Sequence, residues 1–357
     1  MGLKSKKVET LDIIIWIVFL IYVFSQLLQT EFLPLINLLS LSHIKLFGPV
    51  FDIILPIFGL LVVGYFASTL GLFEKSAVRG LTRYVFDFAV PMLLLRTITV
   101  TNLPEVIPWD YLGSYYIGTL IVLLSGICLS HLLWKRTFSQ QVINAFSCSF
   151  SNTVLLGIPI ILLAFGEKAV VPLFIIIGTH GLIMVPLFTI MLEIGKKEKG
   201  RLKTVILRTT FGVIKNPLII GLLSGILCNY FEISLWKPLD DVTKFLGDSV
   251  TPCALFALGA TLAGFRKDIP WQEVPLVLIM KTVIHPLVVW VMASLVFGIK
   301  EVIWIQVLVM LAAQPTGVNP FLFASRYNVG QSVASSAFFM STVISIFTLS
   351  FLLSYFH

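Results

Sequence analysis

The amino-acid sequence predicts an all-α polytopic membrane protein. We expect two inverted five-helix repeats with crossed broken helices 4 and 9, plus one extra N-terminal transmembrane helix. Three observations support this prediction. The 357 residues are 57% hydrophobic and only 12% charged, with a mean hydropathy of +0.98, whereas soluble domains are about 25% charged. The sequence also matches itself at a shift of 161 residues, and two apolar segments are interrupted by proline and glycine at corresponding places in the two halves.

The net charge of +7 is distributed between the apolar segments. Lys and Arg do not gather along one face, and no aromatic–basic interleaving of the RNA-binding kind is present, so we expect no nucleic acid partner. The four cysteines lie in apolar segments without a CxxC pair, at Cys128, Cys148, Cys228 and Cys253. They predict neither a metal site nor a disulfide framework, and no cofactor is expected.

The segment 1–48 is predicted to hold the extra transmembrane helix and a loop. Lys4, Lys6 and Lys7 precede an apolar run from 11 to 28. A basic start followed by an apolar run is also the pattern of a signal peptide. However, the run is about 18 residues long, as a spanning helix requires, and no small-x-small cleavage site follows it. We therefore expect an uncleaved membrane helix, followed by a loop over 30–48.

Ten further apolar segments approach the roughly 20 residues that span a bilayer of about 30 Å. They are predicted at 49–70, 79–98, 109–133, 141–164, 168–194, 215–232, 240–263, 273–297, 302–325 and 331–356. The first five form a repeat over 49–195 and the last five a second repeat over 215–357. A basic cytoplasmic linker over 196–214 joins the two repeats.

The positions of Lys and Arg predict the orientation in the membrane. With the N-terminus in the cytoplasm, most of the 25 Lys and Arg residues fall in cytoplasmic loops, as the positive-inside rule requires. The C-terminus then lies outside. We expect an integral, multi-pass protein of the plasma membrane.

Internal repetition appears when the sequence is shifted by 161 residues. Three prolines and one aspartate then align with an identical residue: Pro56 with Pro217, Pro91 with Pro252, Pro159 with Pro320 and Asp87 with Asp248. Coincidence would give well under one proline match at a proline frequency of about 5%. Because each repeat holds an odd number of spans, the second enters the membrane from the opposite face. The repeats are then inverted, and their fourth helices meet at mid-bilayer.

Both fourth helices contain a break. Proline removes a backbone donor and glycine loosens the helix, so the freed backbone groups must find partners in protein or in a water-filled cavity. The residues predicted to shape the crossing are Gly157, Pro159, Pro315, Gly317 and Pro320. Paired broken helices are the sequence feature that points most directly to the binding site of a transporter.

These breaks resemble those of a known family. The stretches that carry the resemblance are Asn152-Thr153-x-x-x-Gly157-x-Pro159, Pro315-x-Gly317-x-x-Pro320-Phe321 and Leu55-Pro56-Ile57-Phe58. They are similar to the auxin efflux carrier family, which includes the plant PIN proteins. The resemblance implies a scaffold of helices 1, 2, 6 and 7, a mobile transport unit of helices 3–5 and 8–10, and a homodimer through the scaffold. It also implies transport of small organic anions such as auxin or dicarboxylates.

The polar residues at the breaks are predicted to bind the substrate. Half-helix N-termini carry unpaired N–H groups and about half a positive charge, which suits a carboxylate. The predicted substrate-binding residues are Ser151, Asn152, Thr153, Gln314 and Asn319. The alternative is that these side chains only join helices, through hydrogen bonds that average about 0.6 kcal/mol in membranes.

Ionisable residues inside the spans are the candidates for charge or proton coupling. Lys281 and His285 lie four residues apart, hence on one face of a helix. Lys281 would attract the anion and His285 would exchange protons. In the alternative, Lys281 extends to the interface and His285 bonds a carbonyl group. His180 is expected to pack between helices.

Asp87 and Asp248 are also candidates for proton coupling, and they raise the alternative of an intramembrane hydrolase. Two membrane aspartates could share a proton and activate water. The expected motif is missing, because Phe86 and Phe245 stand where an aspartyl protease would have Tyr and Gly. We therefore expect no enzyme, and polar packing in the scaffold as the main role of these aspartates.

These features predict a secondary transporter of small organic anions with an elevator-like mechanism. Membrane potential alone could drive efflux, since one charge is worth about 2.3 kcal/mol at 100 mV, and proton coupling is the other option. A sensor or receptor that kept the transporter fold is the alternative function. The expected partners are the anion, the lipid bilayer and a second copy of the chain.

Overall fold

A computed structural model describes residues 48–103, 106, 108–196, 212, 215–265 and 269–356. The predicted helix at 11–28, its loop and most of the linker 196–214 lie outside the described residues. The range Ile53–Phe356 forms one compact unit. In its described part the chain is nearly all helical, and the only β-type pairing there is one isolated bridge.

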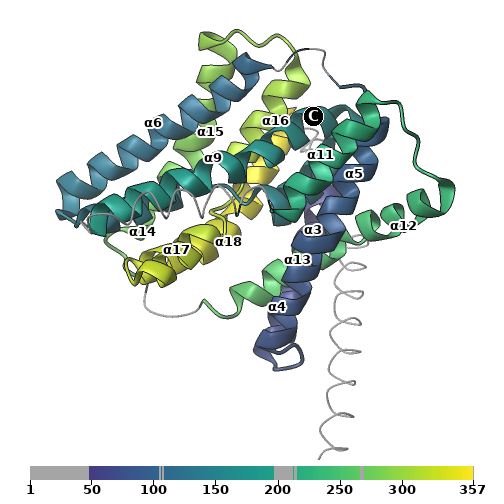
Figure 1. Ribbon diagram of the computed structural model, residues 1–357. Helices are drawn as coiled ribbons and strands as arrows, with labels where there is room; N and C mark the ends of the chain where they lie inside the picture. Colours follow the sequence, from purple (N-terminus) through teal and green to yellow (C-terminus); the bar gives the residue numbers. More distant parts are fainter. Residues whose placement is uncertain are drawn as a thin grey trace, which may run out of the picture. The chain divides into compact units, whose positions relative to one another are not determined.

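The first half of the described chain follows the predicted order of segments (Figure 1). Its elements are α3 (Gly48–Thr69), α4 (Lys75–Tyr84), η3 (Val85–Ala89), α5 (Val90–Val100), α6 (Trp109–Trp134), α7 (Phe138–Ser149), η4 (Thr153–Gly157), α8 (Ile158–Phe165), η5 (Gly166–Ala169) and α9 (Val170–Lys196). A capping box at Thr137 and Gln140 starts α7, because it satisfies backbone donors that the first turn leaves free.

The second half also contains both continuous helices and helices interrupted by π-helical turns. Its elements are α11 (Pro217–Tyr230), α12 (Lys237–Asp248), α13 (Val250–Leu262), α14 (Val274–Ile279), η6 (Met280–Ile284), α15 (His285–Val291), η7 (Met292–Val296), α16 (Val302–Ala313), α17 (Asn319–Tyr327) and α18 (Gln331–Phe356). Five stretches of the described chain are long and apolar enough to cross a membrane. The coarse prediction of an all-α membrane protein is therefore confirmed.

Several prolines sit just after a π-helical turn. Pro91 follows η3, Pro159 follows η4 and Pro286 follows η6. A proline inside a helix lacks an N–H donor and clashes with the preceding turn. A π-helical turn widens the backbone at that point and is a common local adjustment in membrane helices. These prolines lie inside spans predicted from the sequence, but the π-helical turns were not predicted.

The helices pack in two groups. In one group α5 packs against α11 and α12, and α4 packs against α13. In the other, α6 packs against α7 and α15, while α18 packs against α14, α16 and α17. Figure 1 shows the first group with α3 on one side and the second group with α9 on the other. The groups meet mainly where α13 touches η4 and α8, and where α9 touches α5 and α11.

Glycines allow close contacts inside the first group. A Cβ atom added to Gly64 would overlap the Phe256 carbonyl oxygen, and one added to Gly259 would overlap the Leu61 carbonyl oxygen. These glycines therefore bring α3 and α13 into backbone contact, the usual role of small residues between membrane helices. Gly80, in contrast, has no atom within 4 Å of such a Cβ. Gly259 thus packs within the chain.

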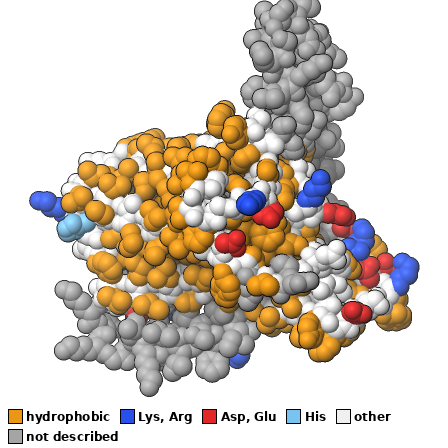
Figure 2. Space-filling model, turned by 90° about the horizontal axis from the view of Figure 1, so that it is seen from above, with side chains coloured by type: hydrophobic (Ala, Val, Ile, Leu, Met, Phe, Trp, Pro, Cys, Tyr) orange, Lys and Arg blue, Asp and Glu red, His pale blue; other side chains and the backbone are white. Residues whose placement is uncertain are grey.

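The surface of the described residues is largely apolar. Figure 2 shows hydrophobic side chains over most of the visible described surface, with charged side chains gathered mainly toward one side of the view. Large apolar side chains with most of their area exposed include Phe245, Phe347, Phe351 and Tyr355. Such a surface is costly in water and is expected in contact with lipid.

Candidate functional site

The two broken segments cross and bond to each other. The Asn152 backbone N–H donates to the Pro315 carbonyl at 2.9 Å, and the Gly317 N–H donates to the Phe150 carbonyl at 3.1 Å. The isolated antiparallel bridge between Ser151 and Thr316 lies between these two bonds. Each break therefore satisfies backbone groups that the other leaves free, as backbone in a membrane requires.

Side chains strengthen the crossing. The Thr316 hydroxyl donates to the Ser147 carbonyl at 2.8 Å, and the Thr316 backbone N–H donates to the Ser341 hydroxyl at 3.0 Å. A Cβ atom on Gly317 would lie 2.9 Å from the Phe150 ring. Glycine at this position therefore allows the two strands of backbone to touch. Thr316 was not among the site residues predicted from the sequence.

Helix N-termini, with partial positive charge, and helix C-termini, with partial negative charge, both lie at the crossing. The segments α7 and α16 end there, whereas η4 and α17 begin there, and Pro159 and Pro320 stand near the N-termini of α8 and α17. The ends of α7 and α16 present carbonyl groups and partial negative charge, and the beginnings of η4 and α17 present N–H groups and partial positive charge. One side of the crossing therefore suits an anion and the other a cation.

A cavity of about 780 Å³ lies against the crossing. Four of the five predicted substrate-binding residues line it, namely Ser151, Asn152, Thr153 and Asn319. The fifth, Gln314, is fully buried outside the lining, and its amide nitrogen donates to the Met310 carbonyl at 3.1 Å. The volume lies within the range of about 300–1,000 Å³ that is typical of small-molecule sites.

Buried polar atoms without partners line this cavity. Asn152 is only 6% exposed, and its amide nitrogen has no hydrogen-bond partner in the structure. His180 is 2% exposed, and both of its ring nitrogens lack a partner. Unpaired buried donors and acceptors are rare in folded proteins, because each costs about 1–3 kcal/mol. At a cavity wall they indicate a place that a polar ligand or water fills.

His180 packs between helices, as predicted from the sequence, and also lines the cavity. Its ring lies 4.6 Å from the Phe150 ring and 5.8 Å from the Tyr115 ring, measured between centroids. Packing against aromatic rings satisfies its apolar faces but not its nitrogens. The sequence does contain a signal for a role at the site. His180 is an ionisable residue inside a span, and no acidic or basic residue lies one helical turn away to pair with it.

Lys281 and His285 lie together behind the cavity wall. The Lys281 ammonium nitrogen is 2.7 Å from the Ser151 hydroxyl, 2.7 Å from the Ala312 carbonyl and 2.9 Å from His285 Nδ1. His285 Nε2 lies 3.1 Å from the Thr119 hydroxyl, which donates to the Tyr115 carbonyl. Lys281 therefore does not extend to the interface, and His285 bonds side chains. The two form one network with the crossing.

A family model described as "Membrane transport protein" matches residues 49–353, which include both breaks and the cavity. The chain belongs to the auxin efflux carrier family of membrane transport proteins. The resemblance stated from the sequence is thus confirmed. Because members of this family are transporters, the match also agrees with the expectation that the chain is not an enzyme.

Three relatives are similar to the chain over most of its length. A protein of Rhizobium meliloti named as a malonate transporter is 28% identical over 303 residues, or 84% of this chain and 94% of that protein. Auxin efflux carrier component 8 of Arabidopsis thaliana is 22% identical over 344 residues, 82% of this chain and 93% of that protein. The lysosomal cholesterol signaling protein of Mus musculus is 24% identical over 314 residues, 83% of this chain but only 36% of that protein.

The two aspartates of this family member form ion pairs within their own helices. Asp87 pairs with Arg83 at 3.1 Å, and Asp248 pairs with Lys244 at 2.6 Å. The two pairs are related by the same shift of 161 residues that relates the prolines. Asp87 is part of the cavity lining, whereas Asp248 is absent from it. The structure thus brings only one of these aspartates to the candidate site.

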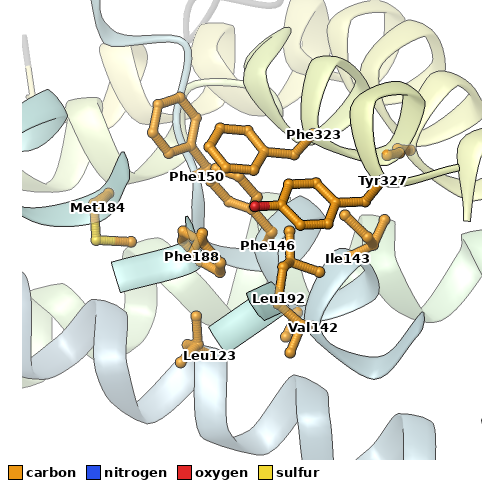
Figure 3. Close-up of a cluster of buried hydrophobic side chains, with 13 residues drawn as sticks. Leu123, Val142, Ile143, Phe146, Phe150, Met184, Phe188, Leu192, Phe323 and Tyr327 are labelled. Carbon is orange, nitrogen blue, oxygen red and sulfur yellow. The ribbon is translucent and has the colours of Figure 1, made fainter. Parts of the chain in front are cut away.

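An aromatic cluster supports the cavity from α7, α9 and α17. Figure 3 shows Phe146, Phe150, Phe188 and Phe323 converging in this cluster. The Phe146 and Phe188 rings stack with centroids 3.5 Å apart, and Phe146 meets Phe323 edge-on at 5.4 Å. Phe150 and Phe323 also line the cavity. Close packing of this kind holds the crossing rigidly against the helices around it.

Two polar contacts between distant segments were not foreseen from the sequence. Glu273, 3% exposed, accepts hydrogen bonds from Arg136 and from the Asn144 amide at 2.7 Å. Arg96 binds Asp240 with two hydrogen bonds, at 2.7 Å and 3.2 Å. The first contact joins α7 to the start of α14, and the second joins α5 to α12. Both lie outside the cavity lining.

Proposed function

We propose that this protein is a secondary transporter that moves small organic anions, such as dicarboxylates or auxin, through the cavity at the helix crossing. The observation that carries the proposal is the unpartnered amide nitrogen of Asn152 at a cavity wall where two half-helices begin. An amide N–H and helix N-termini are donors that suit a carboxylate. The names of the malonate and auxin relatives point to the same class of substrate.

Charge around the cavity supports an anion over a cation. Lys215 and Arg326 are exposed at the cavity lining, and the one carboxylate among the described lining residues, Asp87, is paired with Arg83. Lys281 lies directly behind Ser151. A cleft with positive charge at its mouth concentrates anions and raises their rate of binding. Asn319, at the start of α17, offers a second amide at the cavity lining.

The two groups of helices support an elevator-like mechanism. In this proposal the group with α3, α5, α11 and α13 is a fixed scaffold, and the group with α6, α16 and α18 moves with the substrate. The two halves are inverted repeats, and the N-terminus faces the cytoplasm of a plasma-membrane protein. Lys215 and Arg326 then lie on the cytoplasmic side, so the described conformation opens inward. A homodimer would form through the scaffold, and membrane potential or protons would drive transport.

Transport by purified protein in liposomes tests the proposal. Full-length protein would be reconstituted and loaded with radiolabelled malonate or indole-3-acetate, under imposed pH or voltage gradients. We expect movement of at least one carboxylate that protein-free liposomes do not show. An Asn319→Ala variant with normal folding should lose most of this movement. No movement of any carboxylate across a broad panel, with saturable binding also absent, would contradict the proposal.

A sensor that kept the transporter fold is the second candidate, and one observation favours it. The mouse relative is named a signaling protein, and the chain matches about a third of its length. A sensor would bind the carboxylate, or another small molecule, without moving it. The same liposomes distinguish the two functions, because a sensor gives saturable binding and no accumulation under any gradient.

A further inference from the structure

Lys281 is fully buried, yet its partners include no acid. Its side chain is 0% exposed and lies inside the α14–α15 segment. In the part of the chain that the structure describes, no ion pair involves Lys281, and no cluster of three or more His, Cys, Asp or Glu residues that could hold a metal ion is found. A charged ammonium at this place is expensive in a membrane unless other groups of the protein stabilise it.

The stabilising groups belong to the crossing. The ammonium bonds the Ser151 hydroxyl and the Ala312 carbonyl, both at 2.7 Å. Residues 151 and 312 are 161 positions apart and are themselves in contact, with Ser151 Oγ 3.5 Å from the Ala312 oxygen. The ammonium therefore touches equivalent positions of the two breaks, on the side where α7 and α16 both end. Two helix C-termini there supply partial negative charge.

The geometry matches a site for a cation. In secondary transporters, unwound carbonyls and half-helix C-terminal ends are the groups that coordinate a coupling cation. Here the third ligand is His285 Nδ1 at 2.9 Å. Three acceptors fit the three N–H donors of an ammonium, and His285 can accept at Nδ1 if its Nε2–H donates to Thr119. The cation position is thus filled by the chain itself.

We propose that Lys281 is a tethered cation that takes the place of a coupling Na⁺ or K⁺, so that the anion is bound without an inorganic cation. The inference rests on the proposed function, because it concerns how the same crossing binds its anion. Lys281 acts through Ser151, which lines the cavity, and is therefore a positioning residue. Its charge holds the two breaks together and favours an anion on the other side.

The first test measures binding of malonate and indole-3-acetate to purified full-length protein in nanodiscs, in chloride salts of Na⁺, K⁺ or N-methylglucamine. Wild-type affinity should be the same in all three salts within about twofold. A requirement for Na⁺ or K⁺ in the wild type would overturn the inference while leaving transport of anions intact. Absence of any carboxylate binding would instead count against the proposed function, and the second test would then decide the inference.

The second test is chemical rescue and needs no substrate. Lys281→Ala leaves a space lined by Ser151, Ala312 and His285, whereas Lys281→Met fills the same space with an apolar chain. We expect both variants to unfold at lower temperature, and only the alanine variant to recover in methylammonium or Na⁺. If methylammonium or Na⁺ changes the unfolding temperatures of the two variants and the wild type equally, the inference is overturned. If the alanine variant does not fold, Lys281→Gln should bind malonate about tenfold more weakly, and wild-type affinity in that variant would also overturn it.

Discussion

Replacing Asn152 with alanine tests the anion site in a way that separates binding from folding. The amide nitrogen of Asn152 has no hydrogen-bond partner in the protein, so its removal takes away no hydrogen bond from the fold. It would donate to a bound carboxylate, and a hydrogen bond to a charged group contributes about 1.5–3 kcal/mol. We therefore expect malonate affinity to fall by about 10- to 150-fold, since each 1.4 kcal/mol is about tenfold.

Asn152→Ala should not lower the folding stability, although it lowers the affinity. Most truncations of buried polar residues destabilise a protein, but an unpaired buried donor is itself unfavourable by about 1–3 kcal/mol. The unfolding temperature of Asn152→Ala should therefore stay at the wild-type value or rise slightly. Thermal unfolding and equilibrium binding on the same nanodisc preparation give both numbers.

Tyr116→Phe is the matched control. It removes a hydroxyl that lies 2.7 Å from Thr179 Oγ1 and keeps the ring that stacks on His180. Because this hydrogen bond is satisfied and Tyr116 does not line the cavity, the variant should lose about 1 kcal/mol of stability and keep its affinity. Asn152→Ala with wild-type affinity, or with affinity and stability lost together, would refute the reasoning.

Three further predictions follow from contacts in the structure. Gly259→Ala should destabilise the protein by about 1–3 kcal/mol, because its Cβ overlaps the Leu61 carbonyl, whereas Gly80→Ala should be neutral or stabilising in the same thermal scans. The double variant Lys215→Ala with Arg326→Ala should slow anion binding at low salt and lose this effect near 1 M salt, where the Debye length is about 3 Å. The exposed Lys237→Ala should show neither change, and a salt-independent defect would mean that the mouth charges do not steer the anion. Glu273→Ala should cost about 2 kcal/mol, since it leaves Arg136 without this carboxylate and leaves the Asn144 amide with only the Ser130 hydroxyl as acceptor, while exposed Glu301→Ala should not change the unfolding temperature.

The sequence predicted the backbone arrangement best at the two helix breaks, where few arrangements satisfy the backbone groups. A proline and glycine break inside hydrocarbon must be satisfied by protein or water, and the breaks at Asn152–Pro159 and Gln314–Pro320 indeed bond to each other. Side-chain orientation is a different matter, because it depends on how helices rotate against one another. Gln314 is at the break but turns toward Met310, away from the cavity. The contact of Glu273 with Arg136, 137 residues earlier, has no local signal at all.

The position of Lys281 has a consequence for how voltage acts on the proposed transport cycle. Lys281 belongs to the group of helices that would move, so its ammonium would cross part of the membrane field together with the substrate. With a monovalent anion bound, the moving charges cancel and the loaded step senses little voltage, whereas the empty unit returns with one positive charge, worth up to about 2.3 kcal/mol at 100 mV. With a divalent anion bound, the loaded unit carries one net negative charge, so the loaded step also senses the voltage. The loaded step of malonate efflux from voltage-clamped liposomes should therefore be faster at inside-negative potential. Lys281→Gln should make this step more voltage-dependent, because the positive charge that offsets part of the malonate charge is gone. If the voltage dependence is unchanged in the variant, Lys281 does not move with its charge.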